Sequence, residues 1–217
     1  MPTIITEGKG RLALKFEFAD KWLVHKYDEL REDNFYNKLK GVGYKAVDFL
    51  ASSDKTLLLI EVKYIIADND RSSIRLKEED QNYKTVVAEL REKLSETEWN
   101  AVLFSNKRPY IVDEIDKKVR DTLLGLVAGG RKFDSELLKY SSALHDRKPL
   151  SVMVFLERSG ALNQPEQFKS MASALQKTLE QRLSVLGDIR VAVVNTLTMP
   201  PEMAIKVTAG DILEPRQ

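Results

Sequence analysis

Three charged residues lie inside two apolar runs between residues 45 and 66, and this stretch constrains the fold more than any other. Both runs are rich in strand formers, and residues 52–55, Ser-Ser-Asp-Lys, have the chemistry of a turn, so the sequence predicts a β-hairpin. Asp48 then lies across from Glu61. Because side chains two apart share one face of a strand, Glu61 and Lys63 are expected to project together.

The second apolar run explains why these charges matter. Residues 57–60 are Leu-Leu-Leu-Ile, and a run that is apolar at every position is typical of a strand covered on both sides. Burying a carboxylate and an ammonium group there is costly unless they are paired or bind a metal. Two interpretations follow. Either Asp48 and Glu61 bind a metal beside Lys63, or Lys63 forms a structural ion pair with one of them.

Composition narrows the possible chemistry. The 217 residues, 43% of them hydrophobic, suffice for one full domain with an elaboration. The absence of Cys excludes disulfides, Cys-ligated zinc and thiol catalysis, and only His25 and His145 are present for a histidine-based metal site. This composition remains compatible with a site in which carboxylates bind a hard metal ion. The net charge of +1 provides no overall basic field, so any nucleic-acid surface must be local.

Hydropathy gives no sign of a membrane protein. Residues 1–20 lack the apolar core of a signal peptide, and no apolar run approaches the ~18 residues of a spanning helix. We therefore expect a soluble, cytoplasmic protein with no membrane partner.

Periodicity predicts alternating strands and helices along the chain. In order, we expect an edge strand over 12–18, a helix that Asp20 caps and Gly41-Val42-Gly43 ends or breaks, and then the hairpin. After it we expect a helix over about 77–94 and a helix that begins at Asp113 and stops at Gly129-Gly130. The last third reads as a strand over 150–157, a helix over 165–186 and a strand over 189–197. Such a unit forms a parallel pair with a right-handed crossover, and 204–208 is expected to add an edge strand.

The order Asp48, turn, Glu61-Val62-Lys63 resembles the core of the PD-(D/E)XK nuclease superfamily, with Val47 where the family has Pro. The resemblance covers about residues 20–66 and rests on a short signature. Its context supports it, because the two acids lie on adjacent predicted strands and the glutamate and lysine share a face.

The resemblance implies a restriction-endonuclease-like α/β fold, a mixed central β-sheet flanked by helices. We expect residues 1–217 to form a single nuclease-like domain with a mainly helical insertion at about 75–147. That insertion could bind a protein partner or form a homodimer. Its basic runs could contact phosphates, but a mixed, solvated helix face is favoured because acids lie between the bases. The runs are Lys107-Arg108, Lys117-Lys118-Arg120 and Arg131-Lys132.

The resemblance also implies a catalytic site. Asp48, Glu61 and the Val62 carbonyl would hold Mg²⁺ or Mn²⁺, and Lys63 would orient or deprotonate the attacking water. The substrate class is nucleic acid, with DNA the first choice. In such nucleases a first-helix acid often completes the metal site, and Asp28 is the candidate, against the favoured alternative of a solvated surface charge. The following helix offers weaker candidates in Gln81, Tyr83 and Lys84.

Two other classes of function stay open. One is a non-cleaving nucleic-acid- or protein-binding module on the same fold, and the other is a structural or interaction protein built on the helical segment. A metal-dependent cleavage assay separates the enzyme from both.

Overall fold

The computed structural model describes residues 1–8, 13–29, 34–65, 75–76, 88–101, 110–158 and 160–209. Its largest element is a mixed sheet of five strands in the order β3-β4-β5-β6-β7. The first three are antiparallel neighbours, and β5, β6 and β7 are parallel neighbours. The strands are β3 (Leu23–Lys26), β4 (Phe49–Ser52), β5 (Leu57–Ile65), β6 (Leu150–Arg158) and β7 (Ile189–Val194).

A second, antiparallel sheet consists of β1 (Thr3–Glu7), β2 (Leu14–Phe18) and β8 (Ile205–Ala209) in the order β1-β2-β8. The predicted final strand is thus confirmed as the edge strand β8. The edge position predicted for 12–18 is wrong, because β2 lies between two partners. Alternating hydrophobicity identifies the buried face of a strand, and it carries no information about how many neighbours that strand has.

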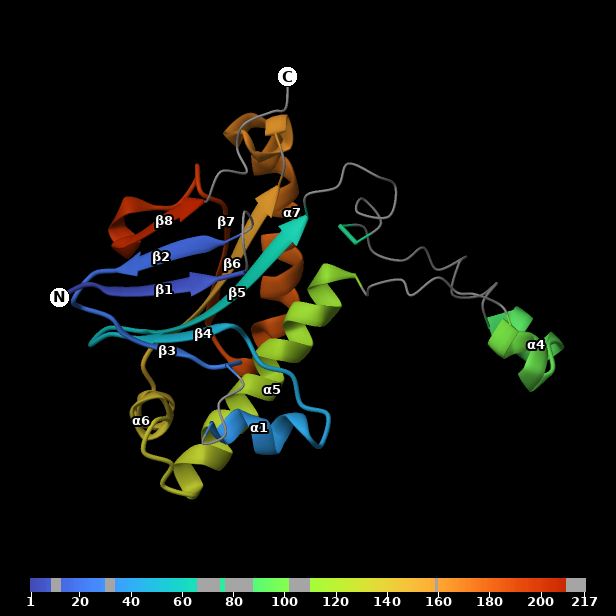
Figure 1. Cartoon of the computed structure of the whole chain (residues 1–217), viewed down its shortest axis with the longest axis horizontal. Helices are drawn as coiled ribbons and strands as arrows, with labels where there is room; N and C mark the ends of the chain where they lie inside the picture. The colour runs from blue at the N-terminus through green and yellow to red at the C-terminus, as the bar shows by residue number, and fades with distance from the viewer. Residues whose placement is uncertain are drawn as a thin grey trace.

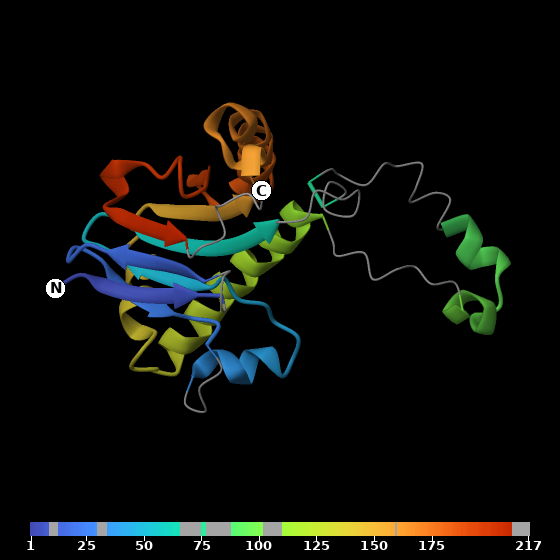
Figure 2. The same ribbon diagram turned by 45° about the horizontal axis from the view of Figure 1, so that its top comes forward.

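Helices cover one face of the five-stranded sheet and the three-stranded sheet covers the other (Figures 1 and 2). Leu57 and Leu59 pack with the helices, while Leu58 and Ile60 pack with β2 and β8. This is why residues 57–60 are apolar at every position, as predicted. In the described ranges the helices with defined ends are α1 (Phe35–Lys40), α4 (Glu96–Ala101), α5 (Ile111–Arg131), α6 (Leu138–His145) and α7 (Pro165–Leu183). Residues 88–93, in the span predicted as a helix over about 77–94, are also helical. The 3₁₀ turns are η2 (Gly160–Asn163), η3 (Ser184–Leu186) and η4 (Pro201–Met203).

The predicted strand–helix–strand unit of the last third is confirmed as β6, α7 and β7, and Gly187 with φ 113° follows the helix. The segment expected as an insertion supplies α5 and α6 to the packed layers, and Ile115, Val119 and Leu126 of α5 are fully buried against the sheet. The mixed α/β class is confirmed. The specific restriction-endonuclease-like arrangement and the single-domain organisation stay predictions.

The helix predicted to follow Asp20 is wrong in its first part, because Leu23–Lys26 forms β3, which pairs with β4. Only the last part of that span is helical, as α1, and the helix ends before Gly41 as predicted. Asn34 caps that helix by accepting a hydrogen bond from the Tyr36 N–H at 3.0 Å. Pairing with a buried strand outweighs the helical spacing of the apolar residues around β3.

Both predicted ends of α5 also need correction. The helix begins at Ile111, so Asp113 lies in its first turn, and it continues through Gly129 and Gly130 to Arg131. A Cβ on Gly129 would lie 2.7 Å from Leu137 Cδ1, and one on Gly130 would collide with Ser141. These glycines therefore allow α6 to pack closely on α5 and do not end the helix.

Candidate functional site

The β4–β5 hairpin brings Asp48 and Glu61 together, as predicted. Phe49 pairs with Ile60, and the Asp48 N–H donates to the Ile60 carbonyl at 3.0 Å. The Val62 N–H donates to Asp48 Oδ2 at 2.5 Å, which fixes this carboxylate against β5. Glu61 is completely buried and Asp48 is 6% exposed. The hairpin thus holds two carboxylates side by side in the interior.

Lys63 lies on the same face of β5 as Glu61, which confirms the predicted alternation. Its Nζ is 2.6 Å from Glu61 Oε1 and 2.6 Å from Glu114 Oε1. Lys63 therefore bridges a strand carboxylate and a helix carboxylate, and its side chain is only 12% exposed. Of the two interpretations from sequence, the ion pair is present, and it leaves the catalytic one open.

Helix α5 contributes Glu114 and Lys118, which sequence analysis did not assign to the site. They lie four residues apart on one side of the helix, and Lys118 Nζ is 2.6 Å from Glu61 Oε1 and 3.5 Å from Asp48 Oδ1. Lys118 had been placed on a solvated helix face with Lys117, yet its side chain is 16% exposed against 51% for Lys117. Glu114 and Lys118 each precede a buried residue of α5, and this position in the sequence could have indicated that they face the sheet.

Arg75 completes the group, and its Nη2 lies 2.7 Å from Glu114 Oε2. The Ile111 N–H donates to the Arg75 carbonyl at 2.9 Å, so the start of α5 and the residue itself are tied together. We call the following six residues the ionic cluster: Asp48, Glu61, Lys63, Arg75, Glu114 and Lys118. It contains three carboxylates and three cations.

Burial works against the charged form of the two hairpin carboxylates. Complete burial raises the pKa of Glu61 to about 7, and the charge of Asp48 adds to this, while Lys63 and Lys118 oppose it. Burial likewise raises the pKa of Asp48, against the charge of Lys118 and the Val62 N–H. The neighbouring carboxylates raise the pKa of Lys118 although burial opposes this. The carboxylates therefore favour cations between them.

Glu114 behaves differently from the hairpin carboxylates. Its partial burial opposes ionisation, but the charge and hydrogen bond of Lys63, with the charge of Arg75, outweigh this and keep the pKa of Glu114 below its ordinary value. Glu114 is thus a fixed negative charge that positions Lys63.

Asp28 lies in the turn after β3, so the prediction that it is an acid of the first helix is wrong. The adjacent Tyr27 N–H donates to the Asp48 carbonyl at 2.9 Å. Burial raises the pKa of Asp28 to about 7, and the charge of Asp48 adds to it. Asp28 is thus half-buried within the electrostatic influence of the cluster, and its role as a metal ligand stays a prediction. Gln81, Tyr83, Lys84 and Lys107-Arg108 lie outside the described residues.

The hairpin carboxylates fit a hard divalent ion. They already share one cation, and Glu61 Oε2 is a buried oxygen with no hydrogen-bond partner within the described part of the chain. Carboxylate and carbonyl oxygens suit Mg²⁺ and Mn²⁺. No group of three or more His, Cys, Asp or Glu side chains that could hold a metal ion occurs within the described ranges. Besides Asp28, which stays a prediction, further ligands from the described residues would be backbone or solvent oxygens, the Val62 carbonyl among them.

A cavity of about 690 Å³ adjoins the cluster. Five of its nine lining residues are Lys or Arg and two are acidic, so its wall is positive overall. The lining residues are Lys45, Val62, Lys63, Tyr64, Arg75, Asp113, Glu114, Lys117 and Lys118. An anionic ligand of moderate size fits both the space and the charge.

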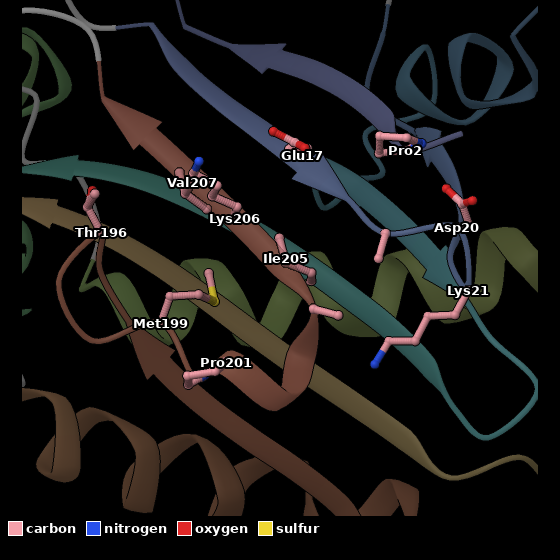
Figure 3. A pocket seen from close by; sticks show the side chains of 12 residues that line it. Pro2, Glu17, Asp20, Lys21, Thr196, Met199, Pro201, Ile205, Lys206 and Val207 are labelled. Atoms are coloured by element: carbon pink, nitrogen blue, oxygen red, sulfur yellow. The ribbon is translucent and has the colours of Figure 1, made fainter.

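A second hollow, of about 860 Å³, lies between β2, β8 and the segment that leads to β8 (Figure 3). Its charged lining residues have both signs and are not buried, and no residue of the ionic cluster lines it. The charged residues that line this hollow are Glu17, Asp20, Lys21 and Lys206. This hollow offers no comparable chemistry.

The chain matches no protein-family model, no curated protein and no solved structure significantly. Among the described residues, no helix has the length and apolar character needed to cross a membrane.

Proposed function

We propose that this protein is a metal-dependent nuclease that hydrolyses phosphodiester bonds in nucleic acid, with DNA as the first choice of substrate. The observation that carries the proposal is the pair of buried carboxylates, Asp48 and Glu61, around a shared cation, with Lys63 2.6 Å from Glu61. Two acids and a lysine in this arrangement support the resemblance to the PD-(D/E)XK nucleases.

In this proposal Asp48 and Glu61 bind Mg²⁺ or Mn²⁺, together with the Val62 carbonyl. A bound ion would supply Lewis-acid chemistry, lowering the pKa of a water and offsetting the charge of the phosphate. Lys63, whose ammonium group is paired with Glu61 and Glu114, would orient the attacking water or stabilise the negative charge that develops on the phosphate. In this protonated form it cannot deprotonate the water. Glu114 keeps the Lys63 ammonium in place through its 2.6 Å contact.

The cavity beside the cluster supports the assignment of an anionic substrate. Lys45 and Lys117 line its wall with the cluster cations, and an incoming phosphate would meet an excess of positive charge. These contacts would position a nucleic-acid backbone without reading its sequence. The proposal therefore names the chemical class and no sequence preference.

One observation favours a second candidate, a binding module that does not cleave. The ionic cluster contains equal numbers of acids and bases, so it satisfies much of its own charge without a metal. A buried network of this kind can persist for structural reasons alone. Binding of nucleic acid without hydrolysis would support this candidate.

The test is a nicking assay on supercoiled plasmid, single-stranded DNA and RNA, with Mg²⁺, with Mn²⁺ and with chelator. We expect metal-dependent cleavage that is lost in Asp48→Asn. The matched control is Asp54→Asn, because Asp54 lies exposed in the turn of the same hairpin. Cleavage that survives chelator, or survives Asp48→Asn, would contradict the proposed mechanism.

A further inference from the structure

The ammonium group of Lys118 lies where a metal shared by the two hairpin carboxylates would have to bind. Its Nζ is 2.6 Å from Glu61 Oε1 and 3.5 Å from Asp48 Oδ1, and it is the only cation that contacts both acids within the described residues. Lys63, by contrast, contacts Glu61 and Glu114. The two lysines therefore have different positions relative to Asp48.

The positive charge of Lys118 at this position opposes the binding of a metal ion. The three carboxylates of the ionic cluster are matched by three cations, and a divalent ion would add two positive charges to a group that is largely shielded from water. Like charges a few ångströms apart repel by several kcal/mol at an effective dielectric of about 20. Metal binding is therefore opposed as long as Lys118 stays between the acids.

Lys118 has space to leave. It projects from α5 and lines the cavity of about 690 Å³, so its long side chain can turn away from the hairpin without any movement of the helix. Its backbone position next to the buried Val119 is fixed by the core. The side chain is thus the part of the cluster that is free to change partners.

We propose that Lys118 is a tethered competitor of the metal, holding Asp48 and Glu61 in the metal-free protein and turning into the adjoining cavity when a divalent ion binds. This inference rests on the proposed metal site and adds a regulatory element to it. The intrinsic metal affinity of the two carboxylates is lowered by the free energy needed to displace the ammonium group. The displaced ammonium then adds to the positive wall that faces an anionic ligand.

The experiment measures Mn²⁺ affinity at pH 8 by the loss of the free-ion electron paramagnetic resonance signal. The variants are Lys118→Met, which removes the charge at similar length, and Lys117→Met, the control on the neighbouring exposed lysine. We expect Lys118→Met to bind Mn²⁺ at least about tenfold more tightly than wild type, because the competing charge is gone. Lys117→Met should change the affinity less than about threefold, since its ion pair is with Asp121 at the surface.

A second neutral variant guards against a folding defect. Lys118→Gln keeps a hydrogen-bond donor for Glu61 and should also bind Mn²⁺ more tightly than wild type, whereas Lys118→Arg keeps the charge and should not. In melting experiments both neutral variants should gain more from Mn²⁺ than wild type does, because a ligand that binds only the folded state raises its stability.

The possible results separate this inference from the proposed function. If wild type binds Mn²⁺ and neither neutral variant binds it more tightly, Lys118 is not a competitor, and the metal site stands. If neither the wild type nor the variants bind Mn²⁺, both the competitor role and the metal-dependent mechanism are overturned.

Discussion

Two glutamates on adjacent parallel strands are buried almost completely, yet their surroundings differ. Glu157, on β6, receives hydrogen bonds on both carboxylate oxygens, from Asn163 Nδ2 at 2.6 Å and from the Thr196 hydroxyl at 2.6 Å. Glu61, on β5, has two ammonium groups on one oxygen and no hydrogen-bond partner on the other within the described residues. The neutral donors around Glu157 form hydrogen bonds with both of its oxygens, whereas Glu61 Oε2 can still accept a hydrogen bond or bind a cation.

This contrast separates architecture from chemistry. Asn163 and Asn195 continue the Glu157 network, with Asn195 Nδ2 donating to Asn163 Oδ1 at 2.9 Å, and both side chains are buried. These contacts join the end of β6 to the segments that follow β6 and β7. The ionic cluster instead places the ammonium-bearing side chains of Lys63 and Lys118 at the wall of a cavity. A buried acid surrounded by neutral donors is a structural element, and one surrounded by exchangeable cations is a candidate binding site.

The largest expected effect comes from exchanging the two glutamates for glutamine. Glu61→Gln should lower cleavage on the order of 10⁴-fold, about 5.5 kcal/mol of transition-state stabilisation, because a metal ligand is lost. Its metal-free melting temperature should stay close to wild type, since Lys63 keeps Glu114 and Lys118 keeps Asp48. Glu157→Gln should retain activity and lose about 1–3 kcal/mol in urea unfolding, because an unsatisfied donor is left buried. Reversed results would make Glu61 the structural residue.

A smaller effect is expected from Lys63→Ala, which should slow cleavage on the order of 10² to 10³-fold with metal affinity retained. Lys55→Ala, in the exposed turn of the same hairpin, is the control. If Lys63 serves only as a buried ion pair, the loss would instead appear as about 3–5 kcal/mol of stability with or without Mg²⁺. Thermal melts under both conditions, beside single-turnover rates, distinguish the two roles.

Exchange of the metal should give a further graded effect. Calcium should compete for the same carboxylates but support turnover at least about tenfold lower than Mg²⁺, because its looser coordination positions the attacking water poorly. Chelator should abolish the activity of the wild type. Equal rates with calcium and magnesium would argue against a precisely coordinated nucleophile.

The last expected effect concerns the pH dependence of stability. The pKa of Glu61 is raised from 4.5 to about 7 in the folded protein, so the folded state binds this proton more tightly than the unfolded state. The stabilisation is therefore complete below about pH 4.5 and is lost as pH rises through 7, up to roughly 3 kcal/mol in total. Metal-free melting temperatures should fall between about pH 4.5 and 7, and Glu61→Gln should flatten that fall.

The local part of the site was predictable from sequence. The strand residues around Glu61 alternate in the ordinary way, and the turn at 52–55 sets the hairpin, so Asp48, Glu61 and Lys63 were placed together correctly. The strand–helix–strand unit at the end of the chain was predictable for the same reason, because each of its elements has its own hydrophobic period.

The long-range part was not predictable. Lys118 and Glu114 belong to the site only because α5 packs across β5, and no pattern within α5 specifies its partner strand. The short strand β3 was assigned to a helix because four residues carry too little periodicity to decide. Gly129 and Gly130 resemble a helix end, but close packing of α6 explains them equally well from the sequence alone. Tertiary contacts decided each case.

The metal site at Asp48 and Glu61 is tested most directly by a crystal structure of the protein soaked with Mn²⁺, with anomalous difference density calculated at the manganese edge. The account predicts a peak bound by carboxylate oxygens of Asp48 and Glu61, and the Lys118 side chain turned into the cavity lined by Lys45 and Lys117. Absence of a peak at millimolar Mn²⁺, with Lys118 still bridging the two acids, would contradict it.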